Sequence, residues 1–132
     1  MRRRVDAARV ARLATLDPAG RLHVVPVCFA LDGETLVTAV DAKPKASSRP
    51  QRLVNVRANP EVALVVDEYA EDWSRLWWVR LRGRARIVAS GPELGRALAL
   101  LGARYPQYRE APPPGPAILV ELTEWRGWAA AP

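Results

Sequence analysis

The sequence predicts a mainly β protein, in which about six antiparallel strands close into a small barrel with two or three short helices packed at its ends. Two observations support this fold class. Apolar and cationic side chains alternate strictly from Trp77 onward, which is the period of a β-strand with one buried face. Shorter β-rich runs are separated by strong turn signals at residues 17–20 (DPAG) and at Asp32-Gly33.

Size and composition are those of one globular unit. The chain has 132 residues, 49% of them hydrophobic, so residues 1–132 are expected to form a single domain. No apolar run reaches the ~18 residues of a membrane helix, and no signal-peptide region follows the basic start. The one cysteine, Cys28, excludes an internal disulfide and is expected to be a buried thiol. We therefore expect a cytoplasmic protein.

The first half of the chain is expected to contain a short helix, three strands and a second helix. The helix spans residues 5–12, and the strands span 13–17, 22–31 and 35–40. Pro26 lies inside the second strand and marks an edge, a bulge or a place where the chain leaves the sheet, because proline cannot donate a ladder hydrogen bond. The second helix is expected over residues 49–58, with Ser48 and Gln51 forming a capping box.

The second half is expected to alternate strands and a helix. A continuous apolar run at residues 62–67 predicts one strand, and the alternation from Trp77 predicts the next. Gly91-Pro92-Glu93 begins a helix that ends near Gly102. A proline-rich loop then leads to a last strand at residues 117–122, followed by a short tail that contains Trp125 and Trp128.

The strand that begins at Trp77 carries a ladder of arginines on one face. Arg82, Arg84 and Arg86 are expected to line an outer face and to pair with carboxylates such as Asp67, Glu121 or Glu124. Trp77 and Trp78 are adjacent, so they point to opposite faces and cannot share one core. One of them is expected to face a partner subunit, a planar ligand or a barrel end.

Side chains that could carry out catalysis are scarce. His23 is the only histidine and Cys28 the only cysteine, and a lone histidine on a strand is more often structural than catalytic. The sequence contains no zinc, calcium, Walker A or dinucleotide motif, so no metal site and no catalytic side chain is assigned. If the protein is an enzyme, a bound cofactor must supply the chemistry.

The strongest candidate for an anion site is the segment that leads into the second helix. It contains Lys43, Lys45, Arg49 and Arg52, and a helix N-terminus favours phosphate through its free N–H groups and its dipole. A solvated basic loop is the alternative. The sequence alone does not rank these four cations.

Five segments resemble the pyridoxamine 5′-phosphate oxidase-like split-barrel superfamily. They are residues 13–17 (LATLD), 20–27 (GRLHVVPV), 41–45 (DAKPK), 57–60 (RANP) and 72–80 (DWSRLWWVR). Within that superfamily the chain is similar to the actinobacterial branch of deazaflavin (coenzyme F420)-dependent oxidoreductases. The resemblance covers residues 11–128, and the DWSRLWWVR segment is its most specific part.

The resemblance implies a six-stranded antiparallel split β-barrel that forms a homodimer, with a flavin or deazaflavin in each of two grooves between the subunits. The cofactor phosphate would be held by Lys43, Lys45, Arg49 and Arg52. Strand residues 24–29 and 36–40 would flank the ring. The implied cofactor contacts also include Val27, Ala39, Val40, Asp41, Trp77, Trp78 and Arg80.

Three functions are compatible with the sequence. The leading hypothesis is an F420-dependent oxidoreductase that transfers a hydride to a small conjugated substrate. The second is an FMN-binding split-barrel protein, either an oxidase or a carrier without turnover. The third is a nucleic-acid-binding module, which ranks last because the arginine face carries few aromatic residues. The chain lacks the longer N-terminal region and the C-terminal substrate segment of the vitamin-making oxidases, so their activity is not expected.

Overall fold

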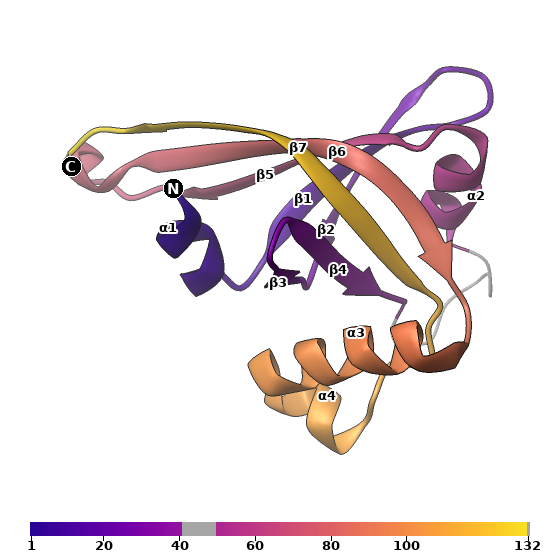
Figure 1. Cartoon of the computed structure of the whole chain (residues 1–132). Coiled ribbons are helices and arrows are strands. Elements are labelled where there is room, and N and C mark those ends of the chain that lie inside the picture. The colour runs from indigo at the N-terminus through magenta and orange to yellow at the C-terminus, as the bar shows by residue number, and fades with distance from the viewer. Residues whose placement is uncertain (41–49, 132) are drawn as a thin grey trace.

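The computed structural model describes residues 1–40 and 50–131, and within these ranges one antiparallel sheet dominates the molecule (Figure 1). Its strands are β1 (Ala11–Leu16), β2 (Leu22–Val27), β3 (Ala30–Asp32), β4 (Thr35–Ala39), β5 (Glu61–Glu68), β6 (Trp77–Val88) and β7 (Ala117–Ala129). The helices are α1 (Arg2–Ala7), α2 (Gln51–Ala58), α3 (Gly91–Arg104) and α4 (Pro106–Glu110), with a 3₁₀ turn η1 (Trp73–Arg75). The mainly β prediction is confirmed.

The order of the strands shows how the sheet curls. The order is β2-β1-β5-β6-β7-β4-β3, so β2 and β3 lie at opposite edges although only Cys28 and Phe29 separate them in the chain. Three Cα–Cα steps can span at most about 11 Å. The two edges must therefore approach each other, and the sheet bends into a barrel that stays split between them.

This arrangement corrects the predicted strand count. We expected six strands, with one of them over residues 22–31, but the described part of the chain contains seven. The expected strand is divided at Cys28, where the chain crosses from one sheet edge to the other. Pro26 lies on the edge strand β2 opposite Arg12, which agrees with the expectation that it marks an edge.

Two apolar clusters stabilise the fold. The larger one fills the barrel, and its fully buried members include Leu13, Phe29, Leu36, Leu64, Leu81 and Ile118. The second cluster lies between α3 and the outer side of the sheet, where Ala97 and Leu101 meet Val37, Val88 and Leu119. Leu94, Ala97, Leu98 and Leu101 recur at helical spacing and form the face of α3 that packs in this cluster.

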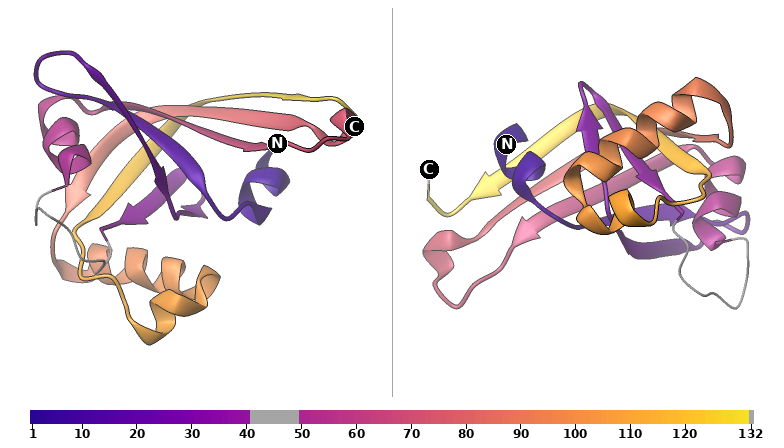
Figure 2. Two further views of the ribbon diagram at one scale, coloured as in Figure 1. Left: turned by 180° about the vertical axis from the view of Figure 1, so that it is seen from behind. Right: turned by 90° about the horizontal axis from the view of Figure 1, so that it is seen from below.

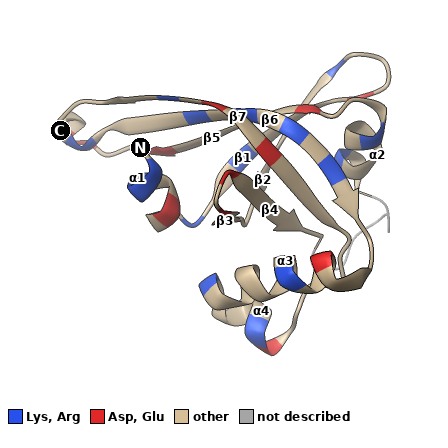
Figure 3. Ribbon diagram, in the orientation of Figure 1, with Lys and Arg blue, Asp and Glu red and all other residues tan. Residues whose placement is uncertain are grey.

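The strand β6 has the predicted alternation. Val79 and Leu81 are buried, whereas Arg82, Arg84 and Arg86 are exposed on the other face. Figure 3 shows these cations as a row along β6. Their partners are carboxylates, as expected. Arg82 pairs with the predicted Glu124, whereas Arg84 pairs with Glu61 and Arg86 with Glu93, which were not predicted.

Several predicted boundaries were wrong. The first helix spans Arg2–Ala7 and not residues 5–12, because Val5 is the residue that it buries in the barrel. The helix α2 begins at Gln51 with Pro50 in the N-cap position, so the predicted capping box does not start it. The expected proline-rich loop contains α4, and β7 continues through Trp125 and Trp128.

The strands β5, β6 and β7 extend beyond the barrel as a three-stranded arm, with the C-terminus at its end (Figures 1 and 2). The helix α1 packs beside this arm, because Arg2 lies over the ring of Trp125 and Arg4 lies over the ring of Trp77. The helices α3 and α4 lie across the β3–β4 side of the barrel (Figure 2). No helix in the described ranges is long and apolar enough to cross a membrane.

Candidate functional site

A narrow opening lies at the split between the two sheet edges, and we name it the edge slot. Its volume is about 170 Å³, and the described residues that line it are Val10, Pro26, Val27, Cys28, Thr38, Ala39, Arg52 and Tyr108. It exists because β3 pairs with β4 only as far as Val37, whereas β4 continues to Ala39. The last residues of β4 therefore face the end of β2 across a gap.

The helix α2 brings a cation to the edge slot. Leu53 and Val56 bury one side of this helix in the barrel core, and Arg52 lines the slot. The first turn of α2 contains no acidic residue, so the positive end of the helix dipole and the Arg52 guanidinium act in the same direction. This end of the slot favours an anionic group.

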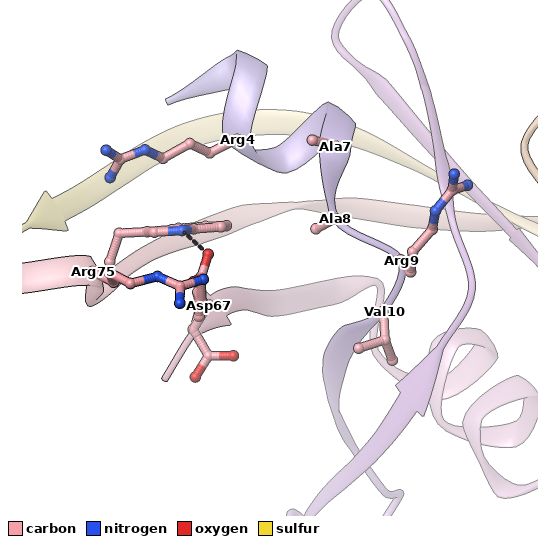
Figure 4. Close-up of a pocket in the computed structure, with 9 residues that line it drawn as sticks. Arg4, Ala7, Ala8, Arg9, Val10, Asp67 and Arg75 are labelled. Carbon is pink, nitrogen blue, oxygen red and sulfur yellow. Dashed lines mark hydrogen bonds and ion pairs between the residues drawn. The ribbon is translucent and has the colours of Figure 1, made fainter. Parts of the chain in front are cut away.

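A second opening, the arm hollow, lies between α1 and the arm (Figure 4). It has a volume of about 540 Å³, and Trp77 forms part of its wall. The Trp77 indole Nε1 donates a hydrogen bond to Glu68 at 3.2 Å, and Glu68 also pairs with Arg75 at 2.8 Å. Asp67, the other acid in the wall, pairs with Arg12 at 3.1 Å. The charges of both carboxylates are therefore compensated within the protein.

A third opening, the α4 hollow, lies between the α1–β1 linker and α4. It has a volume of about 620 Å³, and its described lining consists of Arg9, Cys28, Arg104, Tyr105, Pro106, Gln107 and Tyr108. It shares Cys28 and Tyr108 with the edge slot, and it shares Arg9 with the arm hollow. The three openings therefore adjoin one another around the linker residues Arg9 and Val10, and we call them together the groove.

The structure brings together only part of the predicted site. Val27, Ala39 and Arg52 line the edge slot, and Trp77 lies in the adjoining arm hollow. The predicted contacts Asp41, Lys43, Lys45 and Arg49 lie outside the described residues. Their roles therefore stay predictions.

Three predicted contacts point away from the groove. The Val40 side chain is 7% exposed and belongs to the barrel core. Trp78 and Arg80 lie on the opposite face of β6 from Trp77, where Trp78 is paired across the strands with Trp128. One Nη atom of Arg80 lies 3.5 Å from Glu124. Trp77 and Trp78 point to opposite faces of the strand, as predicted. Within one subunit, Trp78 and Arg80 therefore do not line the edge slot.

Sequence reasoning missed several residues of the groove. Cys28 was expected in the core, but it is half-buried and lines two of the openings, because the chain leaves β2 at this point. Arg9 was expected within the first helix but lies in the linker that follows it, and Tyr108 lies in a helix that was not predicted. The tyrosine spacing within residues 105–108 was the available signal for an aromatic wall.

The most specific sequence motif, residues 72–80, has a structural role at its start. The Asp72 carboxylate accepts hydrogen bonds from the Ser74 hydroxyl at 2.7 Å and from the Ser74 amide at 3.0 Å. These bonds hold the pKa of Asp72 below its usual value. They also begin the η1 turn that directs the chain from β5 into β6, so the Asp-Trp-Ser segment shapes the arm.

His23 lies far from the groove, at the β1–β2 turn. Its Nε2 atom is 3.3 Å from the Asp17 carboxylate, which also accepts hydrogen bonds from the amides of Ala19 and Arg21. This position agrees with a structural role for the histidine. In the described ranges, no group of three or more His, Cys, Asp and Glu residues is arranged to hold a metal ion.

Comparison with known proteins supports the fold and the family. A search of curated proteins returned no match. Among solved structures, a conserved hypothetical protein from Mycobacterium tuberculosis is 22% identical with a TM-score of 0.77, over 97% of this chain and 81% of that one. An FAD-binding protein from Mesorhizobium loti is 24% identical with a TM-score of 0.72, over 96% and 89%. A protein named F420 reductase is 26% identical with a TM-score of 0.65, over 94% of each chain.

The match to a family model covers almost the whole chain. The model described as pyridoxamine 5′-phosphate oxidase aligns with residues 1–129, which include every strand of the barrel and every wall of the groove. The split between the two sheet edges and the helix beside it are therefore features of a shared fold. On this match, the chain belongs to the pyridoxamine 5′-phosphate oxidase family.

Proposed function

We propose that the protein is an oxidoreductase that binds coenzyme F420 in the groove and reduces a small conjugated substrate. One observation carries this proposal: Val27, Ala39 and Arg52, predicted as cofactor contacts from the sequence, meet at the edge slot. The likeness to a protein named F420 reductase favours this deazaflavin.

The residues of the edge slot fit a planar ring that carries an anionic tail. The walls contributed by Pro26, Val27 and Ala39 are apolar and belong to strand ends, which present flat surfaces. Arg52 and the first turn of α2 supply positive charge at one end, where a phosphate would be stabilised. The slot shares lining residues with both larger hollows, so a substrate bound in either hollow would lie beside a ring in the slot.

A reduced deazaflavin would supply a hydride to one carbon of an activated double bond, and solvent would supply the proton to the neighbouring carbon. The protein contributes positioning. Val27 and Ala39 would orient the ring, Arg52 would bind the phosphate, and Cys28 and Tyr108 would separate the slot from the α4 hollow.

We further propose that a second copy of the chain covers the outer face of β1 and β2. Leu22 and Val24 are 75% and 63% exposed on this face, and they lie opposite Leu16 and Ala14. Adjacent strand β5 adds Ala63 and Val65 to the same face. Arg12 and its ion-pair partner Asp67 lie on this face too, beside the apolar side chains. An exposed apolar patch with charged groups at its rim is typical of a protein interface. A homodimer would also provide a route by which Trp78 and Arg80 of one subunit approach the groove of the other.

An FMN-binding protein is the second candidate, and the likeness to an FAD-binding protein supports it. The same slot and the same cations would hold a flavin phosphate. A nucleic-acid-binding function has less support, because Arg82, Arg84 and Arg86 are paired with carboxylates.

Titration of the purified protein with F420, FMN and FAD, followed by cofactor fluorescence, tests the proposal. We expect the tightest binding for F420, and turnover of a conjugated substrate by its reduced form. The Lys45→Gln/Arg52→Gln double variant should weaken binding by about 100-fold or more, because each of the two lost charge-assisted hydrogen bonds is worth about 1.5–3 kcal/mol.

The matched control is Arg57→Gln, which removes a cation from the last turn of the same helix. It should change the affinity by less than about twofold. Arg57 lies at the C-terminal end of the helix, where its charge interacts with the negative end of the dipole and not with a bound phosphate. Unchanged affinity in the double variant would exclude the phosphate site. Tighter binding and turnover with FMN would favour the second candidate.

A further inference from the structure

The α4 hollow has a charge pattern that differs from that of the arm hollow. Both openings are of ligand size, with volumes of about 620 and 540 Å³. The acids that line the arm hollow pair with arginines within the protein. The described lining of the α4 hollow contains Arg9 and Arg104 and no acidic residue.

The two arginines of the α4 hollow are held by backbone carbonyls and aromatic rings. The Arg104 guanidinium donates to the carbonyls of Asp6 and Ala8, and it lies over the ring of Phe29 at 5.0 Å. Backbone carbonyls orient a guanidinium without cancelling its charge. In the described ranges, neither Arg9 nor Arg104 forms an ion pair with a carboxylate.

Arg9 is exposed and is the cation of this pair that a ligand can reach. Its Nη1 atom donates to the Arg104 carbonyl at 2.7 Å, and its guanidinium lies over the Tyr105 ring at 5.9 Å. These contacts fix the group but leave its Nη2 and Nε atoms without an acceptor among the described residues. Figure 4 shows the Arg9 side chain directed away from Asp67 and Arg75, so neither wall group of the arm hollow competes for it.

The remaining walls suit an aromatic or conjugated ligand. The rings of Tyr105 and Tyr108 are in contact at a tilt of 58°, with their centroids 5.5 Å apart. The Tyr105 hydroxyl is bonded to the backbone of Arg9 and Phe29 at 3.0 Å, which fixes one ring against the linker. Tyr108 and Cys28 form the boundary with the edge slot, so a ligand in the hollow lies next to the proposed ring site.

We infer that the α4 hollow binds a small planar organic acid, with its carboxylate on Arg9 and its conjugated part against Tyr105 and Tyr108. A fixed guanidinium binds a carboxylate through two donors, and the aromatic walls accept the flat part of the molecule. The role of this acid as the substrate rests on the proposed oxidoreductase function. The binding site itself rests on the geometry of the hollow.

The test compares two probes that differ only in charge, cinnamate and its neutral methyl ester. Their dissociation constants are measured by ligand-observed NMR at low salt, with the wild-type protein free of cofactor. We expect cinnamate to bind about five- to tenfold more tightly than the ester, because a single exposed charge-assisted contact is partly screened by water. Raising the salt concentration to about 0.5 M should reduce this preference.

Three variants locate the effect. Arg9→Gln should bring the two affinities to within about twofold of each other, and Arg9→Lys should keep part of the preference, since it keeps the charge and loses the fork geometry. Arg3→Gln removes an equal charge from α1, where Arg3 lines a different opening, and should leave the preference unchanged. Circular dichroism melting curves confirm that each variant is folded.

The outcomes separate this inference from the proposed function. Equal binding of acid and ester, or an equal loss in Arg3→Gln and Arg9→Gln, would overturn the inference. Titration of the same samples with F420 and FMN reports on the edge slot independently. A preserved preference for cinnamate without any cofactor binding would count against the proposed function and leave the acid site standing.

Discussion

The side-chain amide of Asn55 on α2 donates a hydrogen bond to the Thr15 hydroxyl on β1 at 2.9 Å, and both side chains are buried. The Asn55 oxygen in turn accepts a hydrogen bond from Gln51 at 2.8 Å. This short polar chain connects the first turn of α2 to the barrel wall. It therefore fixes the position of the helix that carries Arg52 to the edge slot.

Replacing Asn55 by leucine should destabilise the protein by about 2–3 kcal/mol, because the Thr15 hydroxyl loses its partner in a buried place. Thr15→Val, which leaves the buried Asn55 amide without its acceptor, should also cost about 1–3 kcal/mol. The double variant should be less destabilised than the sum of the two, because no unsatisfied group remains. Urea unfolding of the four proteins measures this coupling, and strictly additive losses would show that the bond has no energetic role.

Gly83 lies at the bulge in β6, where a Cβ atom would overlap the backbone carbonyl of Glu121 on β7. Gly83→Ala should therefore cost about 3 kcal/mol in unfolding free energy, because backbone and not a flexible side chain must move. The control is Gly95→Ala on α3, where nothing lies within 4 Å of the added atom. That substitution should stabilise the protein by about 0.5–1 kcal/mol. Denaturation curves with equal losses for both variants would contradict the clash.

The Asp17 carboxylate should make stability depend on pH below about 4. Its pKa is lowered from 3.8 to about 2, chiefly by the hydrogen bond from the Arg21 amide. The folded-state pKa lies below the unfolded value, so the stabilisation is complete above about pH 4 and is lost as the pH falls toward 2. The unfolding free energy of Asp17→Asn should vary less than that of the wild type over this interval. Parallel slopes in urea titrations at several pH values would exclude this role for Asp17.

Val24 tests the proposed contact between two copies of the chain. Val24→Glu places a charge on the apolar face of β1 and β2, and the dimer dissociation constant should rise by about a hundredfold or more. Ala99→Glu adds the same charge on the exposed side of α3 and should leave the dimer intact. Sedimentation velocity over a concentration series measures both. A monomeric wild-type protein at high concentration would contradict the proposal.

The fold could be predicted where local signals determine it. The alternation in β6 specifies a strand with one buried face without any knowledge of its neighbours, and the same holds for the apolar spacing in α3. The division of residues 22–31 could not be predicted in the same way, because no turn residue marks Cys28. The chain changes course there only because the curled sheet brings its two edges near each other, which is a property of the whole barrel.

The site was predictable to a similar extent. Val27 and Ala39 came from strands that the resemblance implies beside the ring, Arg52 came from the basic segment that leads into the second helix, and the structure brings all three to one opening. Arg9 and Tyr108 reach the same groove from a linker and a short helix that are far apart in the sequence. Their proximity depends on the packing of α3 and α4 against the barrel, and no local pattern reports that packing.

The position of β4 in the sheet has a consequence for synthesis of the chain. The strand β4 is hydrogen-bonded to its hairpin partner β3 and, on its other side, only to β7. The β3–β4 hairpin therefore cannot join the sheet before β7, the last strand of the chain, has been synthesised. Thr35 pairs with Glu121, which lies 86 positions later in the sequence. During translation, the hairpin therefore joins the sheet only after nearly all of the chain has been synthesised. The edge slot, which β4 lines, is among the last parts of the structure to form.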